Sequence, residues 1–386
     1  MSKLGIIAIG YNRAESMERL LKALARAEYG EDRPLLLISI DYSGSDKVTE
    51  IAQKYEWIYG EKVLKIQKER LGLREHVLKC GSYMKEFELD AVAVFEDDVV
   101  PSPAFYCFMK QAVEFYRFDV NVAGISLYTH LINVNTRFPF QPAYGEGDVF
   151  FLQFAQSWGQ IWMCKQWEEF VEWYERLPEG KCPEEGVPRN IIEWPSTSWL
   201  KYHISYCVQR HKYFVYPYIA FSTCYTDVGQ HSSHHTTLFQ VPMNYNTTQC
   251  FRFTKLENAL VKYDCFFERE EMGKYLGVND KDLCVDLYGS KEKIEQRYIL
   301  TTKKYPYFRT KSFALELRPH ELNICYDEIG NDIILYDTDQ MGLNSKQKKN
   351  VDEIDYYFRT EISGSRIAKY IIEKKMRELF RDKGEK

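Results

Sequence analysis

The sequence predicts an α/β fold in which helices cover both sides of a doubly wound, mostly parallel sheet. Short apolar runs at 4–9, 35–40, 63–66 and 91–95 alternate with segments whose apolar residues recur at helical spacing. The runs are apolar at consecutive positions, which is typical of parallel strands buried on both faces. Because crossovers between parallel strands are right-handed, the alternation generates a doubly wound layer.

Turn-forming residues separate these elements in order. The first run passes through Gly10-Tyr11-Asn12-Arg13 into a helix, and the second ends at Asp41, followed by the turn Ser43-Gly44-Ser45. The third run leads through Arg70-Leu71-Gly72 into a helix at about 74–85. Ligands of open α/β sheets bind beyond the carboxyl ends of the strands, so these segments are candidate functional positions.

The composition excludes several classes of function. The 51 Lys and Arg residues against 56 Asp and Glu give a net charge of -5, without the broad positive field that nucleic-acid binding needs. No apolar run approaches the roughly 18 residues of a membrane span, and run 4–9 is too short for a signal peptide. The 10 cysteines include no Cys-x-x-Cys pair, which argues against a zinc ribbon. We expect a cytoplasmic protein with free thiols.

The fourth run ends at Phe95 and is followed by Glu96-Asp97-Asp98. Adjacent carboxylates repel one another unless a cation or hydrogen-bond donors compensate. On extended backbone, Glu96 and Asp98 would point to one side and Asp97 to the other. Oxygen ligands suit Mg²⁺ or Mn²⁺ held by one or two carboxylates plus substrate phosphates. The alternative, acids at a helix start, is disfavoured because Ser102-Pro103 already supplies the start signal of the next helix.

Asp41, Arg13 and Arg70 are candidate residues at neighbouring strand ends. Asp41 is either a turn-forming residue or an acceptor of hydrogen bonds from a base or a ribose. The two arginines would neutralise a diphosphate, or they are solvated loop charges.

Taken in order, these residues resemble a GT-A type glycosyltransferase. The likeness lies in the strand that ends in Gly10-Tyr11-Asn12-Arg13, in Asp41 with its Ser-Gly-Ser turn, and in the acidic triplet that closes a strand. It extends to bacterial family-two-like glycosyltransferases of surface-glycan loci and, more distantly, to eukaryotic N-acetylglucosaminyltransferase I. The stretches that carry it are Gly72-Leu73-Arg74-Glu75-His76, the segment from Phe95 to Pro103, and Ser157-Trp158-Gly159-Gln160. The resemblance implies a GT-A domain over residues 1–240.

The resemblance also implies roles for individual residues. Arg13, Asp41 and His76 would contact the nucleotide of a UDP-sugar, and Glu96 and Asp97 would lie near its uracil and ribose, while Arg70 is a further candidate for the same nucleotide-sugar from its position at a strand end. Asp98 would hold a Mn²⁺ or Mg²⁺ ion, which stabilises the charge on a departing nucleoside diphosphate. For His76 the alternative is a helix-face histidine satisfied by a neighbour.

An inverting transfer needs a carboxylate base to deprotonate the acceptor hydroxyl. At the position that the resemblance gives to this base, two residues before Trp199, the chain has Thr197, which cannot serve. The nearest acid is Glu193, and Asp227 is the other candidate. The alternative for both is a structural role in a cap or turn.

Six of the seven tryptophans lie between 158 and 199. Most are expected in the core, but an open ring is a stacking platform for a sugar, and Trp158 and Trp199 are candidates. His231 would complete the metal shell, or it belongs to a solvated loop.

Beyond residue 240 the likeness ends. Short strands and turns predict an accessory β-rich or α+β module over 241–343, followed by a linker and a basic amphipathic helix over 344–386. The helix either packs on protein or lies on an anionic membrane surface, where lipid-linked glycan acceptors reside.

Three functions follow as hypotheses. The first is metal-dependent, inverting transfer of a sugar from a UDP-sugar to a glycan or lipid-linked glycan hydroxyl in bacterial surface-polysaccharide synthesis. A sugar-nucleotide nucleotidyltransferase is disfavoured, because such enzymes typically carry a G-x-G-x-x-R loop where this chain has Gly10-Tyr11-Asn12-Arg13. The third is a non-catalytic glycan-binding module, suggested by the aromatic residues and the missing base.

Overall fold

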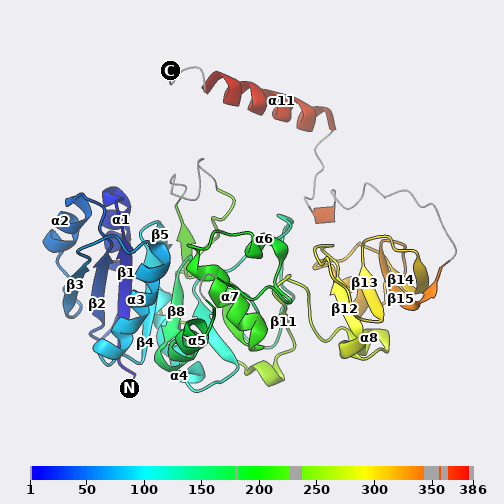
Figure 1. Cartoon of the computed structure of the whole chain (residues 1–386), viewed down its shortest axis with the longest axis horizontal. Coiled ribbons are helices and arrows are strands. Elements are labelled where there is room, and N and C mark those ends of the chain that lie inside the picture. The colour runs from blue at the N-terminus through cyan, green and yellow to red at the C-terminus, as the bar shows by residue number, and fades with distance from the viewer. Residues whose placement is uncertain (1, 179–180, 226–236, 343–355, 358–363, 382–386) are drawn as a thin grey trace.

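The computed structural model describes residues 2–178, 181–225, 237–342, 356–357 and 364–381. Within them the chain forms a nine-stranded sheet flanked by helices and a separate four-stranded sheet, as Figure 1 shows. The large sheet has the order β11-β7-β9-β6-β8-β4-β1-β2-β3. The α/β fold with a large, mostly parallel sheet is thus confirmed.

The parallel part of the sheet consists of the four strands expected from the apolar runs. They are β1 (Leu4–Gly10), β2 (Leu35–Ile40), β3 (Lys62–Ile66) and β4 (Ala91–Glu96). In this register Ile7 lies between Leu37 on β2 and Val94 on β4. Every residue of β1 and β2 is buried, whereas β3 is a partly exposed edge strand. The carboxyl ends of β1, β2 and β4 therefore meet at one edge of the sheet.

The remaining strands extend the sheet beyond β4 with mixed directions. β8 (Gln160–Met163) runs antiparallel to both β4 and β6, whereas β6 and β9 are parallel. The other strands of this region are β6 (Val122–Ser126), β7 (Val149–Leu152), β9 (Tyr213–Pro217) and β11 (Lys262–Tyr263). A two-stranded antiparallel pair stands apart from the sheet and consists of β5 (Val99–Pro101) and β10 (Ser222–Cys224).

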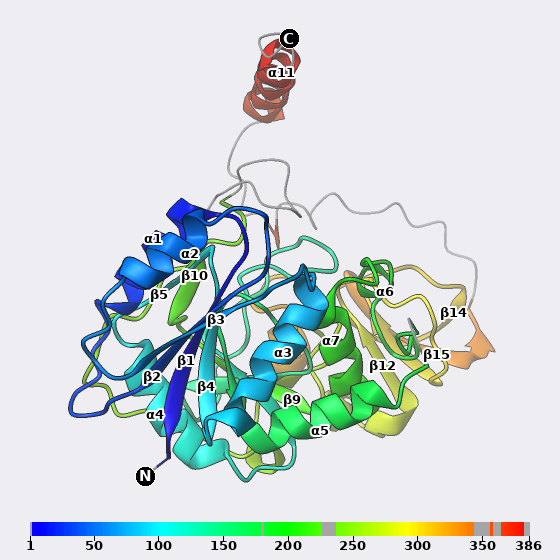
Figure 2. The ribbon, with the colours of Figure 1, turned by 60° about the vertical axis from the view of Figure 1, so that its left-hand side comes forward.

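Two hydrophobic cores lie on opposite faces of the sheet because side chains alternate along each strand. Ile6 and Ala8 face one core, and Ile7 and Ile9 face the other. The helices of the first core are α1 (Ala14–Leu24), α2 (Lys47–Lys54) and α4 (Phe105–Tyr116). Those of the second are α3 (Leu73–Glu86), α5 (Cys164–Glu175) and α7 (Trp199–Gln209), on the other side of the sheet in Figure 2.

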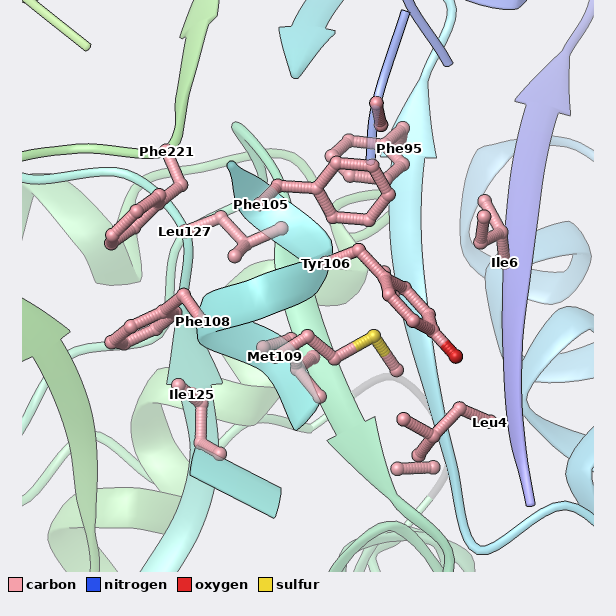
Figure 3. Close-up of a cluster of buried hydrophobic side chains, with 14 of the residues drawn as sticks. Leu4, Ile6, Phe95, Phe105, Tyr106, Phe108, Met109, Ile125, Leu127 and Phe221 are labelled. Atoms are coloured by element: carbon pink, nitrogen blue, oxygen red, sulfur yellow. The ribbon is translucent and has the colours of Figure 1, made fainter. Parts of the chain in front are cut away.

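Aromatic residues of α4 pack in the first core against the residue that precedes the acidic triplet. Figure 3 shows Phe105 and Phe108 of α4 between the strands and Phe221. The ring of Phe95, the last residue before the triplet, meets Phe105 edge to face at 5.2 Å between centroids. Such contacts fix the end of β4 and hence the position of the residues that follow it.

The predicted boundary at residue 240 is wrong. β11 pairs in parallel with β7 of the large sheet, so the first domain extends at least to Tyr263. Pairing between segments a hundred residues apart leaves no local signal in a strand of two residues. The predicted accessory module is a smaller body with its own core, which includes Met272, Leu300 and Leu335.

This smaller body contains a four-stranded sheet in the order β12-β13-β15-β14. Its strands are β12 (Leu283–Asp286), β13 (Tyr298–Thr301), β14 (Tyr307–Phe313) and β15 (Ile333–Met341). Short helical turns complete the described chain: α6 (Arg189–Ile192), η1 (Leu256–Asn258), α8 (Gly273–Leu276), η2 (Asp280–Asp282) and α9 (Leu322–Cys325).

The predicted C-terminal helix is α11 (Gly364–Arg381), whose apolar side chains Ile367, Ile371, Ile372 and Met376 are exposed. None of the helices in the described part of the chain has the length and apolar character that crossing a membrane requires. All ten cysteines lie in described residues and are free thiols there.

Candidate functional site

Backbone hydrogen bonds join the segments that follow β1, β2 and β3 at the carboxyl edge of the parallel strands. The amide of Asp41 donates to the carbonyl of Gly10 at 3.0 Å, and the amide of Gln67 donates to the carbonyl of Ile40 at 2.9 Å. The edge therefore gathers the residues that the sequence singled out after three different strands.

The acidic triplet forms the connection between β4 and β5. Glu96 ends β4, and Asp97 and Asp98 make the turn. The expectation that Asp97 and Asp98 point to opposite sides is wrong, because a turn replaces the extended backbone and both carboxylates reach Arg13. The amide of Tyr225 donates to the carbonyl of Asp98 at 2.9 Å and so fixes the turn from the side of β10.

Arg13 is the counter-ion of the triplet. It lies directly before α1, and its Nη2 pairs with Oδ1 of Asp97 while its Nη1 lies 3.2 Å from Oδ2 of Asp98. Burial lowers the pKa of the Arg13 guanidinium, but the attraction of Asp97 and Asp98 outweighs it and raises the pKa above its usual value. The contact follows from topology, since β1 and β4 are neighbours and end at the same edge.

The two aspartates differ in exposure. The side chain of Asp97 is only 5% exposed, and burial raises its pKa to about 6 although Arg13 acts in the opposite direction. The side chain of Asp98 is 32% exposed. Asp98 is thus the carboxylate of the pair that faces solvent.

Glu96 is held by a tryptophan. The side chain of Trp199 hydrogen-bonds to the carboxylate, while burial, followed by repulsion from Asp98 and Asp97, raises the pKa of Glu96 to about 8. Trp199 is only 3% exposed and packs edge to face on Trp162, with centroids 5.8 Å apart. The prediction that Trp199 is an open platform for a sugar is therefore wrong: the ring is part of the core.

Asp41 is buried and fully engaged by backbone. Its Oδ1 accepts hydrogen bonds from the amides of Tyr42 and Leu71, and its Oδ2 from the amide of Gly72, all at 2.9 Å. Of the two alternatives for Asp41, this geometry is that of the turn-forming residue. It fixes the loop that carries Arg70.

His76 is buried beneath the site in the first turns of α3. It is 2% exposed, and its Nε2 lies 2.7 Å from Oγ of Ser39 on β2. Burial lowers its pKa to about 4, so the ring is neutral near pH 7. The geometry is that of a core histidine satisfied by a neighbour and leaves the ring away from solvent.

Arg70 is exposed above the ring of Tyr11, with 5.2 Å from its guanidinium carbon to the ring centroid. Among the described residues no carboxylate pairs with it. Arg70 is therefore a cation at this edge that a bound anion can engage.

Trp158 is half-buried close to β10. Its ring stacks on Phe239 with centroids 4.8 Å apart, and its carbonyl accepts a hydrogen bond from Oγ of Ser222 at 2.5 Å. The next residue, Gly159, has φ +89, and a Cβ there would lie 2.6 Å from Oγ of Ser222. The Ser-Trp-Gly-Gln motif thus has a structural requirement for glycine, and Trp158 as a residue is partly exposed.

Glu193 ends the short helix α6. Its side chain is 63% exposed and its Oε1 lies 2.9 Å from Nε of Arg189, which also pairs with Glu292 of the smaller body. The other candidate base, Asp227, and the candidate metal ligand His231 lie outside the described residues.

The side chains that could act as metal ligands fit a divalent cation that is held only partly by protein. Within the described ranges no three His, Cys, Asp or Glu side chains are grouped so that they could hold a metal ion. Asp97 is buried, Glu96 and Asp98 are partly exposed, and Glu96 already has Trp199 as a partner, so Asp98 is the acid of the triplet best placed to bind a metal ion. This fits Mg²⁺ or Mn²⁺ bound through one carboxylate plus substrate phosphates, and it does not fit a cage of protein ligands.

Sequence reasoning missed the bond between Trp199 and Glu96 and the contact between Arg70 and Tyr11. The adjacency of strand ends was a usable signal for the contacts of Arg13, but no local pattern pairs a helix start at 199 with a strand end at 96.

No known family model and no curated protein matches the sequence. Among solved structures, the chain is similar to S. aureus TarS residues 1–349 in complex with UDP-GlcNAc, with 14% identity over 59% of this chain and 60% of that one, at a TM-score of 0.40. A Pyrobaculum calidifontis mannosyltransferase in complex with GDP-Man and Mn²⁺ gives 15% identity over 46% and 48%, at 0.32. A Leptospira borgpetersenii cytidylyltransferase gives 14% over 45% and 65%, at 0.27.

In each case the match spans less than two thirds of the other protein's own length. At these scores and identities the likenesses are partial, and they assign neither activity nor substrate to this chain. Strand order and burial identify it as an α/β protein whose mostly parallel sheet presents an arginine-paired acidic turn at its carboxyl edge.

Proposed function

We propose that the protein is a metal-dependent glycosyltransferase that moves a sugar from a UDP-sugar to the hydroxyl of a glycan or lipid-linked glycan. The observation that carries the proposal is the position of Arg13, Arg70 and Asp98 at the carboxyl edge of β1, β2 and β4. Two arginines and a solvent-facing carboxylate suit a diphosphate and its cation. Ligands of open α/β sheets bind at this edge.

The residues of the edge divide into those that bind and those that position. Arg70 is the exposed cation that engages the diphosphate, and Tyr11 supports it. Asp98 holds the Mg²⁺ or Mn²⁺ ion. When bound, such an ion stabilises the charge that develops on the leaving nucleoside diphosphate. Asp41 shapes the loop that carries Arg70.

The hydrogen bond from Trp199 and the pair with Arg13 assign positioning roles to Glu96 and Asp97 respectively. Both acids are held by protein groups, so we propose that they shape the turn beside Asp98 rather than bind uracil or ribose.

We propose an inverting transfer with a carboxylate base. Among described residues the candidate is Glu193, which is exposed but tied to Arg189. Arg189 occupies Oε1 of Glu193, so Glu193 would accept a proton there only after the acceptor displaces Arg189. Replacement of Glu193 by Gln with intact turnover would remove it as the base. Trp158, which is partly exposed, remains the candidate platform for the sugar or acceptor.

The acceptor belongs, in this proposal, to bacterial surface-polysaccharide synthesis in the cytoplasm, with α11 in contact with the membrane. The sequence of α11 has six basic and two acidic residues among 18, and its apolar residues Ile367, Ile371, Ile372 and Met376 are exposed. An amphipathic helix with a basic face binds anionic lipid surfaces. The proposal expects sedimentation of the full chain with anionic vesicles and its loss in a chain that ends at residue 343.

The test of the activity is incubation with Mn²⁺ and a panel of UDP-sugars, followed by measurement of UDP release. We expect slow release with one donor and its loss in Asp98→Asn. Turnover that depends on pyrophosphate would instead identify a nucleotidyltransferase, and failure to bind any nucleotide would identify a glycan-binding module.

A further inference from the structure

Arg13 makes two contacts of different kinds with the acidic turn. Its Nη2 pairs closely with the nearly buried Asp97, whereas its Nη1 lies 3.2 Å from the partly exposed Asp98. Removal of the partner of a buried charge is costly, whereas an exposed pair contributes little. The contact with Asp98 is therefore the one that can be broken while Arg13 stays in place.

Backbone hydrogen bonds hold Arg13 and the acidic turn in place. Arg13 directly precedes α1, and its carbonyl accepts the hydrogen bond of the Met17 amide at 3.1 Å. The side chain thus projects from a fixed helix start toward a turn that Tyr225 fixes from the other side. The backbone at both ends of the ion pair is therefore held by hydrogen bonds, so release of Asp98 by Nη1 is a change of side chains.

We propose that Arg13 pairs with the carboxylate of Asp98 where the divalent cation would otherwise bind, and thereby makes metal binding depend on the diphosphate of the donor. This inference rests on the proposed function. A cation that approaches Asp98 alone must displace Nη1 and then remain beside the positive guanidinium. A diphosphate between the two cations offsets this repulsion and gives Nη1 a new partner. Arg13 is in this sense a positioning residue, which acts through Asp98.

The test measures Mn²⁺ binding without nucleotide, from the electron paramagnetic resonance signal of free Mn²⁺. The full chain should bind Mn²⁺ weakly. The double variant Arg13→Gln/Asp97→Asn removes both members of the buried pair and leaves Asp98, so it avoids an unpaired buried carboxylate. We expect it to bind Mn²⁺ about tenfold more tightly, equivalent to about 1.4 kcal/mol. Unchanged or weaker binding would overturn the inference.

Three control variants test whether the charge of Arg13 and its contact with Asp98 are responsible. Arg13→Lys keeps the positive charge and should bind Mn²⁺ as weakly as the unaltered chain, so a gain in affinity there would contradict the inference. Arg70→Gln removes a cation that does not touch Asp98, and its affinity for Mn²⁺ alone should stay unchanged. Asp98→Asn in the double variant should abolish the gained affinity, and persistence of that affinity would place the metal elsewhere and overturn the inference.

The same titration with UDP present separates this inference from the proposed function. If UDP and Mn²⁺ together fail to bind the full chain, the proposed function is wrong, while the metal-only comparison still decides the role of Arg13. If they bind together and the double variant shows no gain with Mn²⁺ alone, only the role of Arg13 is wrong.

Discussion

The carboxylate of Asp41 accepts a hydrogen bond from the amide of Gly72 at 2.9 Å, across a separation of 31 residues. A second bond, from the amide of Leu71, binds the other oxygen. An acidic side chain at the end of β2 thus determines the path of the loop that carries Arg70. The site depends in this way on residues that need not touch a substrate.

Asp41→Asn should destabilise the protein. An amide group offers one acceptor oxygen where the carboxylate offers two, so at least one backbone N–H loses its partner at a buried position. We expect a loss of about 1–3 kcal/mol in the free energy of unfolding, measured with urea. Asp46→Asn is the matched control, because Asp46 precedes α2 without a side-chain cap and should change stability little. Equal effects of the two substitutions would contradict the assigned role.

Trp199→Phe should weaken the binding of UDP with Mn²⁺ as well as stability. The phenylalanine ring fills most of the space but cannot donate to Glu96, beside the acidic turn. We expect a loss of about 1–3 kcal/mol in unfolding free energy and a severalfold loss of affinity by calorimetry. Trp167→Phe is the control, because Trp167 is also buried but its Nε1 has no partner among the described groups. It should lower stability and leave nucleotide affinity intact.

Gly159→Ala should be strongly destabilising. The added Cβ would lie 2.6 Å from Oγ of Ser222 and 3.2 Å from the ring of Phe95, at a φ of +89. We expect about 2–4 kcal/mol from strain and displacement together, measured by urea unfolding. Gly44→Ala measures the backbone strain alone, because Gly44 has φ +76 and nothing lies within 4 Å of the added atom. If Gly159→Ala lowers the free energy of unfolding no more than Gly44→Ala does, the residues around Gly159 move aside without cost and the prediction is wrong.

His203 should make a contribution to stability that is lost in mild acid. Burial lowers the pKa of this histidine to about 3, and neither ring nitrogen has a partner in the described structure. The unfolded chain takes up the proton below about pH 6.5 and the folded chain does not, so the stability present above pH 6.5 is lost as the pH falls. The difference in unfolding free energy between His203→Phe and the unaltered chain should therefore shift by about 2 kcal/mol in favour of the variant between pH 7.5 and pH 5. Thermal or urea unfolding at the two pH values measures this shift.

Exposed His211 offers the control for this pH dependence. Its φ of +49 is accepted by asparagine, and His211→Asn removes an imidazole without altering the core, so it should not show the gain expected of His203→Phe. If the free energy of unfolding of His203→Phe depends on pH as it does in the unaltered chain, water reaches the buried ring.

Lys291→Met should loosen the junction between the two bodies. Its Nζ lies 2.6 Å from Oδ2 of Asp264, which follows β11 of the large sheet, while Lys291 follows β12 of the small one. Both side chains are largely buried, so loss of the cation should cost about 2 kcal/mol in unfolding free energy. Lys274→Met breaks an exposed contact with Glu271 and should cost less than about 0.5 kcal/mol. Similar losses in both variants would argue against a junction held by Lys291.

The sequence by itself determined the parallel strands and the placement of the acidic turn. Consecutive apolar residues in β1, β2 and β4 permit burial on both faces only, and this local property survives folding. The sequence also predicted that Arg13 and the acids follow strands that share a carboxyl edge, whereas the pairing of β1 with β4, which brings them into contact, came from the tertiary structure.

Only the tertiary structure decided which polar groups are engaged by protein and which face solvent. Asp41, His76 and Trp199 looked like binding residues, yet each is buried and satisfied by segments that are distant in the sequence. The first domain likewise continues past residue 240, because β11 pairs with β7. Hydrogen bonds and strand pairing between distant segments depend on three-dimensional proximity, which no local pattern of residue types records.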